Sequence, residues 1–443
     1  MNFSKSNEIV KRDQKVIANA SRIKFYPFVM AKGYGAIVED VDGNQYIDLL
    51  SSAAALNLGH SHPKVVEAVK KAADDFTHYG PVYFYQDSNV SLAEKLVAAT
   101  PGDFAKKVSF GLTGSDSNDG AIKFARGYTK RDKIIAFKGA YHGSTFGAIS
   151  LSHISLNMRR KIGSLLPDIF AFDFPNVYRN GIADGQRCLQ QIEEAFKSYL
   201  PPEEVAAIIV EPIQGDAGLL VPPKDFIQGL AKICQKHGIL FVSEEVQQCY
   251  MRTGKMFAIE HFEVVPDMVI IAKPMAGGLP MSAIIGRQEI MDCLDSPAHA
   301  FTFAANNIAC SAAIATIDVV NTPEFQNDVL QKGALLKQLL DELKEKYKFV
   351  GDVRGLGLSI GVEIVKDKES KEADPLAAIK IIYKSWQRGV ILVTLAGNVL
   401  RIQPPLVISE AEIKQAVKII DLAMQDYAAG KISDEEVADI SGW

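Results

Sequence analysis

The sequence has no long hydrophobic run, few cysteines and no excess of charge of one sign. No apolar stretch approaches the roughly 18 residues that a membrane-spanning helix needs, and the opening MNFSKSNEIVKRDQK has no apolar core typical of a secretory signal. The 48 basic and 53 acidic residues leave a net charge of −5. This balance gives no reason to expect a nucleic acid or an anionic membrane surface as a partner.

Cysteine is scarce: five residues are scattered along the chain, with no CxxC pair and no spacing typical of a metal site. An odd and sparse set of this kind predicts free thiols and a cytoplasmic protein. His60 and His62 stand close together, but no third ligand is near them, so turn and cap roles are favoured over metal binding. The sequence therefore predicts no metal centre.

Strand-like and helix-like segments alternate from about residue 105 to about residue 290. Val205–Val210 and Met268–Ala272 are apolar throughout, as strands of a parallel sheet buried on both faces are. A helical stripe lies between such strands and ends at Gly238. This alternation predicts an α/β fold with a large, doubly wound and mostly parallel sheet.

The pattern changes from about residue 323 onward. A long charged helix, two short strands around Arg401 and a final helix opened by the capping box Ser409–Glu412 predict an α+β lobe. Tyr34–Leu50 alternates apolar residues around an Asp-Gly turn, which predicts a hairpin that joins this lobe. We therefore expect an N-terminal arm and part of a small domain over residues 1–59, a large domain over 60–322 and the rest of the small domain over 323–443.

Two helix starts follow from local signals. Ser91-Leu-Ala-Glu94 has the pattern of a capping box and predicts a helix that begins there. Another helix is expected over Asn118–Tyr128, after the strand Val108–Phe110 and a hydroxyl-rich turn. Free N–H groups and the helix dipole at such a start favour a bound phosphate, and Thr113 and Ser115 add hydroxyls. The alternative is that these polar residues are plain N-caps.

Two predicted strands end at ionisable residues. Ile239–Val242 runs into Glu244 and Glu245, and Met268–Ala272 stops at Lys273. Because the carboxyl ends of parallel strands meet at one edge of a sheet, we expect these side chains to meet there. A lysine and a carboxylate in this place suit pyridoxal phosphate, which the lysine would hold covalently while the carboxylate keeps the pyridine nitrogen protonated. The alternative is a surface lysine beside a solvated turn.

Further candidates follow other strands. Tyr141 comes after a predicted strand, where its ring could stack on a flat cofactor, and Glu211 and Asp216 follow Val205–Val210. The loop His78–Gln86 is dense in aromatic residues, as ligand-lining loops often are, although simple packing explains it equally well.

Together these pieces resemble a known family. TGSDSNDGAIKFARGYT, YHGSTFG, EPIQG, EEVQ…RTGKMFAIEHF, AK…GGLPMSAIIG, FTFAANN and LRIQPPL occur in the order and spacing of the class III pyridoxal-phosphate aminotransferases, which have fold type I. The chain is more closely similar to the isoleucine 2-epimerase group of that family, which are racemases of nonpolar amino acids. That similarity extends through LNMRRKIG, EPIQGD, the SPAHAFT loop and LAGNVLRIQPPLV to a C-terminal Gly-Trp.

The resemblance implies a role for each matching residue toward pyridoxal 5′-phosphate. Lys273 would hold the cofactor and move the proton on one face. Glu244, where the family usually has Asp, would pair with the pyridine nitrogen. The other implied roles are phosphate binding by Thr113, Gly114 and Ser115, ring contacts by Tyr141 and Val246, approach to the phenolic oxygen by Gln247, binding of the substrate carboxylate by Arg401, shielding of that arginine by Glu211, and contact with the phosphate of the partner subunit by Thr302. The last role implies a homodimer with a composite active site, or a higher oligomer.

The leading hypothesis is racemisation, which needs an acid/base group on each side of the substrate. Lys273 serves one side, and Asp216 is the candidate for the other, unless it only orders its own turn. The alternative is a class III aminotransferase that uses 4-aminobutyrate or another ω-amino donor. A cofactor-binding protein without activity is less favoured because the lysine is intact. The aromatic loop Tyr79–Tyr85, with Tyr83 as a candidate contact, indicates a nonpolar amino acid as substrate.

Overall fold

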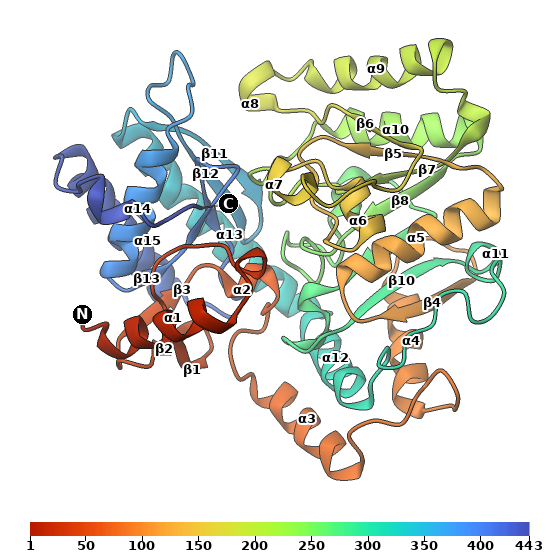
Figure 1. Ribbon diagram of the computed structural model, residues 1–443, viewed down its shortest axis with the longest axis horizontal. Helices are drawn as coiled ribbons and strands as arrows, with labels where there is room; N and C mark the ends of the chain where they lie inside the picture. The colour runs from red at the N-terminus through yellow and green to blue at the C-terminus, as the bar shows by residue number, and fades with distance from the viewer. Residues whose placement is uncertain (443) are drawn as a thin grey trace. The chain divides into compact units, whose positions relative to one another are not determined.

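The computed structural model describes residues 1–442; Trp443, the last residue of the Gly-Trp motif, lies outside them. The chain forms two compact units, Met1–His62 with Asn327–Trp443, and Pro63–Gln326 (Figure 1). No helix among residues 1–442 is long and apolar enough to cross a membrane.

The unit Pro63–Gln326 is built on a seven-stranded sheet with the order β4-β10-β9-β8-β7-β5-β6 (Figure 1). The pairs from β9 to β6 are parallel, whereas β10 runs antiparallel to both β9 and β4. This mostly parallel sheet confirms the predicted α/β class. The strands are β4 (Lys106–Gly111), β5 (Lys133–Phe137), β6 (Ile169–Phe172), β7 (Val205–Val210), β8 (Leu240–Glu244), β9 (Met268–Ile271) and β10 (Ser282–Arg287).

Helices connect these strands and cover the sheet. Every residue of the interior strand β7 is fully buried, as expected of an apolar strand with helices on both faces. The helices of this unit are α3 (Pro63–Asp75), α4 (Asp87–Ala99), α5 (Gly114–Thr129), α6 (Phe146–Leu151), α7 (Leu156–Arg159), α8 (Val177–Asn180), α9 (Asp184–Ser198), α10 (Lys224–His237), α11 (Gln288–Met291) and α12 (Asn307–Val320). Short 3-10 turns are η2 (Pro202–Glu204), η3 (Ala258–Phe262) and η4 (Lys273–Ala276).

The other unit contains two four-stranded sheets, β1-β2-β3-β13 and β11-β12-β15-β14. In the first, β3 pairs in parallel with β13, so that Ile47 lies opposite Val390. The strands are β1 (Met30–Tyr34), β2 (Ile37–Asp40), β3 (Gln45–Asp48), β11 (Val350–Leu356), β12 (Ser359–Ile364), β13 (Val390–Ile391), β14 (Val393–Leu395) and β15 (Val399–Ile402). The helices are α1 (Ser4–Val16), α2 (Ser51–Ala54), α14 (Pro375–Gln387) and α15 (Glu410–Ala428), with 3-10 turns η1 (Asn19–Ser21) and η5 (Glu435–Val437). Helix α13 (Pro323–Lys346) begins in the large unit and continues into this one.

The turn α2 is left-handed. Its four residues, Ser51 to Ala54, have φ between 45° and 63°, a conformation that costs about 1–2 kcal/mol for each residue with a side chain. Asp48 stabilises the start of the turn, because one of its carboxylate oxygens accepts hydrogen bonds from the N–H groups of Leu50 (2.8 Å) and Ser51 (2.9 Å). The other oxygen lies 2.8 Å from His60 Nε2, so this histidine supports the same turn.

Two predicted helix starts are wrong. Helix α4 begins at Asp87, so Ser91 and Glu94 lie inside it and do not form a capping box. The acidic Asp87 in the first turn complements the helix dipole and allows the earlier start. Helix α5 begins at Gly114 rather than at Asn118, since Thr113 is its N-cap and forms a reciprocal capping box with Asp116.

An aromatic stack connects the N-terminal residues to α14. The ring of Trp386, which is 2 % exposed, stacks between Phe3 (centroids 4.4 Å apart) and Tyr26 (4.9 Å). The hydroxyl of Tyr26 also donates to the carbonyl of Leu392 at 2.8 Å. The N-terminal arm is therefore part of the core of its unit.

We predict that Trp386→Ala lowers the free energy of unfolding by about 3–5 kcal/mol, because it leaves a large cavity between two rings. Thermal or urea unfolding followed by circular dichroism measures this. Tyr34→Ala is the control: this aromatic residue of the same unit is 70 % exposed and its loss should have little effect. Equal effects of the two substitutions would show that the stack does not stabilise the unit.

Candidate active site

The candidate site lies in the large unit, where the carboxyl ends of the parallel strands reach one edge of the sheet. Glu244 is the last residue of β8, and Lys273 follows the neighbouring strand β9. Tyr141 follows β5, and the Nζ atom of Lys273 lies 5.9 Å from the centre of its ring. The three side chains therefore reach the same edge of the sheet from different strands, as their order in the sequence predicted.

The N-terminus of α5 forms a cup suited to a phosphate. The hydroxyl of Ser115 accepts a hydrogen bond from Ser144 N at 3.1 Å, which ties the helix to the loop after Tyr141. A Cβ atom on Gly143 would lie 2.2 Å from that hydroxyl, and one on Gly114 would lie 2.9 Å from Val246. Only glycine allows this close approach. The start of a helix favours a bound anion, because its first N–H groups have no partner within the helix. The cup fits the phosphate of the expected cofactor.

Glu244 carries a buried carboxylate beside this cup. Its side chain is 4 % exposed; Oε1 lies 3.3 Å from Asn118 Nδ2 and 3.7 Å from His142 Nδ1, and Oε2 accepts from Val246 N at 3.4 Å. Burial alone would lower the pKa of His142, but the carboxylates of Glu244 and Glu211 outweigh it and raise that pKa above its ordinary value. A carboxylate in this position fits a protonated pyridine nitrogen.

Glu245 does not join the site, although it is adjacent to Glu244 in the sequence. Its carboxylate is fully buried on the other side of the strand, where it accepts hydrogen bonds from the N–H groups of Ala258 and Ile259, both at 2.8 Å. Burial raises its pKa to about 7 despite these bonds. Glu245 therefore holds the start of η3.

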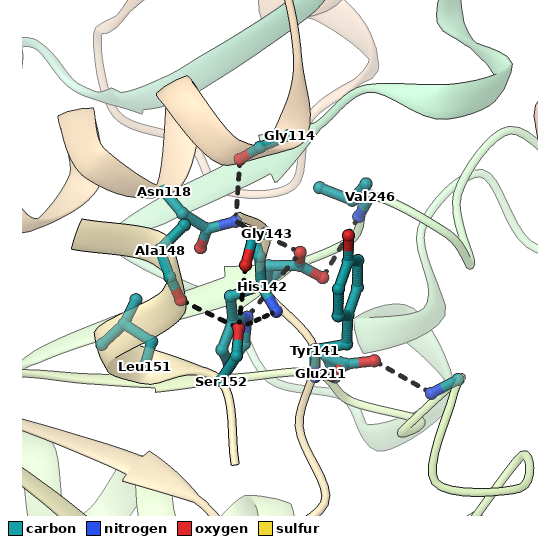
Figure 2. Close-up of polar contacts among 12 residues, drawn as sticks. Gly114, Asn118, Tyr141, His142, Gly143, Ala148, Leu151, Ser152, Glu211 and Val246 are labelled. Atoms are coloured by element: carbon teal, nitrogen blue, oxygen red, sulfur yellow. Dashed lines mark hydrogen bonds and ion pairs between the residues drawn. The ribbon is translucent and has the colours of Figure 1, made fainter. Parts of the chain in front are cut away.

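Glu211 connects two loops of the site. One carboxylate oxygen accepts from Tyr141 N at 3.0 Å and the other from Gly215 N at 2.9 Å (Figure 2). The side chain is 5 % exposed, and burial together with the charge of Glu244 raises its pKa to about 8. Within this unit, Glu211 fixes the main chain of Tyr141 and of the loop that carries Asp216.

Asp216 and Gln247 are in contact. Gln247 Nε2 donates to Asp216 Oδ1 at 3.2 Å, and Gln248 Nε2 donates to Gln247 Oε1 at 3.1 Å. All three side chains are buried, with exposed fractions of 6 % for Asp216, 4 % for Gln247 and 2 % for Gln248. A carboxylate that is held in this way keeps a fixed direction, as an acid/base group requires.

Three sequence candidates are not part of this cluster. Tyr83 is 77 % exposed in the aromatic loop, and Thr302 is exposed in the segment before α12. Arg401 lies in β15 of the other unit, where it is 4 % exposed and its Nε donates to Gln403. Their roles toward substrate or partner stay predictions.

Sequence reasoning missed Asn118 and His142, which contact Glu244 from two different elements (Figure 2). A signal for Asn118 was available: it stands four residues after Gly114, so a helix that starts at Gly114 places both on one face. The late helix start that we expected concealed this spacing.

Comparison with known proteins gives a consistent result. The family model for aminotransferase class-III matches residues 17–424. The isoleucine 2-epimerase of Lentilactobacillus buchneri is 42% identical, with 100% of this chain and 99% of that protein covered. The leucine/methionine racemase of Thermococcus litoralis is 40% identical, over 99% of this chain and all of that protein.

A solved structure of a Bacillus anthracis aminotransferase is also similar. It is 28% identical, has a TM-score of 0.88, and the match covers 96% of this chain and 99% of that one. The sheet described above is thus that of the fold type I enzymes, and the chain belongs to the class-III aminotransferase family.

Proposed function

We propose that this protein is a pyridoxal-phosphate-dependent racemase or epimerase of nonpolar amino acids. The observation that carries the proposal is that Lys273 and a buried acid/base candidate, Asp216, both follow parallel strands at the carboxyl edge of one sheet. Two relatives that are at least 40% identical over nearly the whole chain are an epimerase and a racemase. Their identity to this chain supports inversion at Cα over transamination.

The cofactor is pyridoxal 5′-phosphate, and when bound it supplies an electron-withdrawing ring that makes the substrate Cα–H acidic. Thr113, Gly114 and Ser115 would bind its phosphate at the start of α5, and Glu244 would supply a negative charge for its ring nitrogen. Tyr141 and Val246 would contact its ring, and Gln247 would approach its phenolic oxygen.

Lys273 removes the proton from Cα on one face of the substrate, and Asp216 delivers a proton to the opposite face. In the reverse direction the two residues exchange these tasks, so no other reactant is consumed. Gln247 keeps the Asp216 carboxylate in place through the 3.2 Å hydrogen bond. Arg401 is the proposed ligand of the substrate carboxylate, and the nonpolar side chain is assigned to the aromatic loop around Tyr83.

We also propose a homodimer in the cytoplasm. Five exposed aromatic residues lie in the aromatic loop and in the segment before α12. The ring centres of His78 and Phe303 lie 5.0 Å apart, which connects this loop to the segment that holds Thr302. Exposed apolar patches of this kind mark protein interfaces. The exposed residues are Tyr79, Tyr83, Phe84, Tyr85 and Phe303. All five cysteines are free thiols, as a reducing compartment favours.

The direct test is incubation of the purified protein with L-isoleucine and no keto acid, followed by chiral chromatography. Inversion at Cα alone should convert it to D-allo-isoleucine until both are present in comparable amounts. The family alternative is transamination with 4-aminobutyrate or another ω-amino donor, which requires a keto acid as second substrate. Conversion that begins only when a keto acid is added would overturn the proposal in favour of this alternative.

Asp216→Asn should nearly abolish inversion while leaving exchange of the α-proton of one enantiomer with heavy water. Lys273 remains able to act on its own face, whereas loss of a general acid/base group commonly lowers a rate by about 10²–10⁴-fold. Proton NMR in heavy water measures exchange, and chiral chromatography measures inversion. Asp225→Asn, which alters an exposed carboxylate on α10, is the control. Inversion by Asp216→Asn near the parent rate would show that another group serves the second face.

Glu244→Gln should lower the turnover rate by about 10–100-fold, because a neutral amide replaces a charged partner of the ring nitrogen. Glu244→Asp preserves the charge and should retain most of the activity. Steady-state kinetics of the two variants, each saturated with cofactor, measure the difference. Equal rates for the glutamine variant and the parent would show that the carboxylate does not act on the ring nitrogen.

A further inference from the structure

The buried amide of Asn118 contacts three separate parts of the cofactor site. Its Nδ2 atom lies 2.9 Å from the carbonyl of Gly114, 2.9 Å from the carbonyl of His142 and 3.3 Å from Oε1 of Glu244 (Figure 2). Asn118 itself is fully buried. One side chain therefore touches the helix start that forms the phosphate cup, the loop after β5 and the end of β8.

The donors of this amide are fully used. An amide NH₂ group has two hydrogens, and the two shortest contacts are to the backbone carbonyls. The contact with Glu244 is longer, so it shares one of these hydrogens in a bifurcated arrangement. Replacement by aspartate, which has no N–H donors, would leave the buried carbonyl of His142 and the partly buried carbonyl of Gly114 without this partner and bring a carboxylate close to them.

The loop after β5 is held from its other side by Ser152. The hydroxyl of Ser152 accepts from His142 N at 2.8 Å and donates to the carbonyl of Ala148 at 2.9 Å (Figure 2). His142 thus has its N–H bound by Ser152 and its carbonyl bound by Asn118. Its imidazole, also fully buried, lies 3.7 Å from Oε1 of Glu244.

The two oxygens of Glu244 consequently have different surroundings. Oε1 faces Asn118 and His142, whereas the contact recorded for Oε2 is the long one to Val246 N. Glutamate has one more rotatable bond than the aspartate usual in this family, so its carboxylate needs more support to hold one direction. Asn118 and His142 supply that support at a single oxygen.

We propose that Asn118 is a positioning residue that fixes the phosphate cup, the loop bearing Tyr141 and His142, and the Glu244 carboxylate in one arrangement that retains the cofactor. It acts by holding Oε1 of Glu244, which leaves Oε2 as the oxygen available to the ring nitrogen. This inference rests on the cofactor site and not on the direction in which the substrate proton moves. It therefore stands or fails separately from the racemase proposal.

The test compares the holoenzymes of the parent and Asn118→Asp, which has the same shape but no N–H donors. Loss of the hydrogen bonds to Gly114 and His142, with a carboxylate in their place, should accelerate cofactor release about tenfold or more. The readout is the visible absorbance that remains with the protein after repeated ultrafiltration. Retention equal to that of the parent would overturn the proposal.

Asn398→Asp is the matched control, because Asn398 is a buried asparagine of the other unit whose Nδ2 donates to the carbonyl of Ile364 at 2.7 Å. It should lower the unfolding temperature without changing cofactor release. Equally rapid cofactor release from Asn118→Asp and Asn398→Asp would show that general instability causes the release, and would overturn the proposal. If Asn118→Asp does not fold, Asn118→Ser serves instead. Its hydroxyl can donate to the carbonyl of Gly114 but not also to that of His142, so it should release the cofactor faster than the parent, and release at the parent rate would overturn the proposal.

A double variant tests the contact with Glu244 itself. Glu244→Gln provides N–H donors opposite the new carboxylate of Asn118→Asp, so the pair exchanges its donor and acceptor. Asn118→Asp should then accelerate cofactor release less in the Glu244→Gln background than in the parent. If the double variant releases the cofactor at the rate obtained by multiplying the effects of the two single substitutions, the two side chains act independently. That result would contradict the proposed contact.

Discussion

The buried carboxylate of Glu244 is the constraint on which the site depends. A carboxylate that is 4 % exposed must be paired or hydrogen-bonded, because burial of an isolated charge is very unfavourable. Asn118 and His142 lie against one of its oxygens, and the positive ring nitrogen of the cofactor is the partner expected for the other. Neither ring nitrogen of His142 has a hydrogen-bond partner among residues 1–442, so its main interaction is electrostatic. The charge on Glu244 thus connects the fold of this unit to the chemistry of its cofactor.

Two other buried carboxylates, those of Glu211 and Glu245, bind backbone N–H groups. Glu211 uses both oxygens on the main chain of Tyr141 and Gly215, and Glu245 uses its carboxylate on the start of η3. Asp216 instead receives its recorded hydrogen bond from the side chain of Gln247. Glu211 and Glu245 thus hold loops in place, whereas Asp216 is the acid/base group that we propose for the second face of the substrate.

The sequence predicted the sheet and its edge well because these depend on local pattern. β7 has its predicted bounds, Val205–Val210, and Lys273 follows an apolar strand as expected. Glu244 and Glu245 were expected to meet at one edge, yet neighbouring residues of a strand point to opposite faces, and only the first enters the site. The predicted start of α4 was wrong because a Ser-x-x-Glu pattern also occurs within a helix. The contacts of Asn118 were missed because they depend on three elements that are distant in sequence.

The central claim is that Lys273 holds the cofactor. Its Nζ lies 5.9 Å from the ring centre of Tyr141, at the same edge of the sheet as Glu244. Reduction of the holoenzyme with borohydride fixes the cofactor on the lysine that binds it, and peptide mass spectrometry then identifies that lysine. The account predicts a single adduct on the peptide that contains Lys273. An adduct on another lysine, or none, would contradict it.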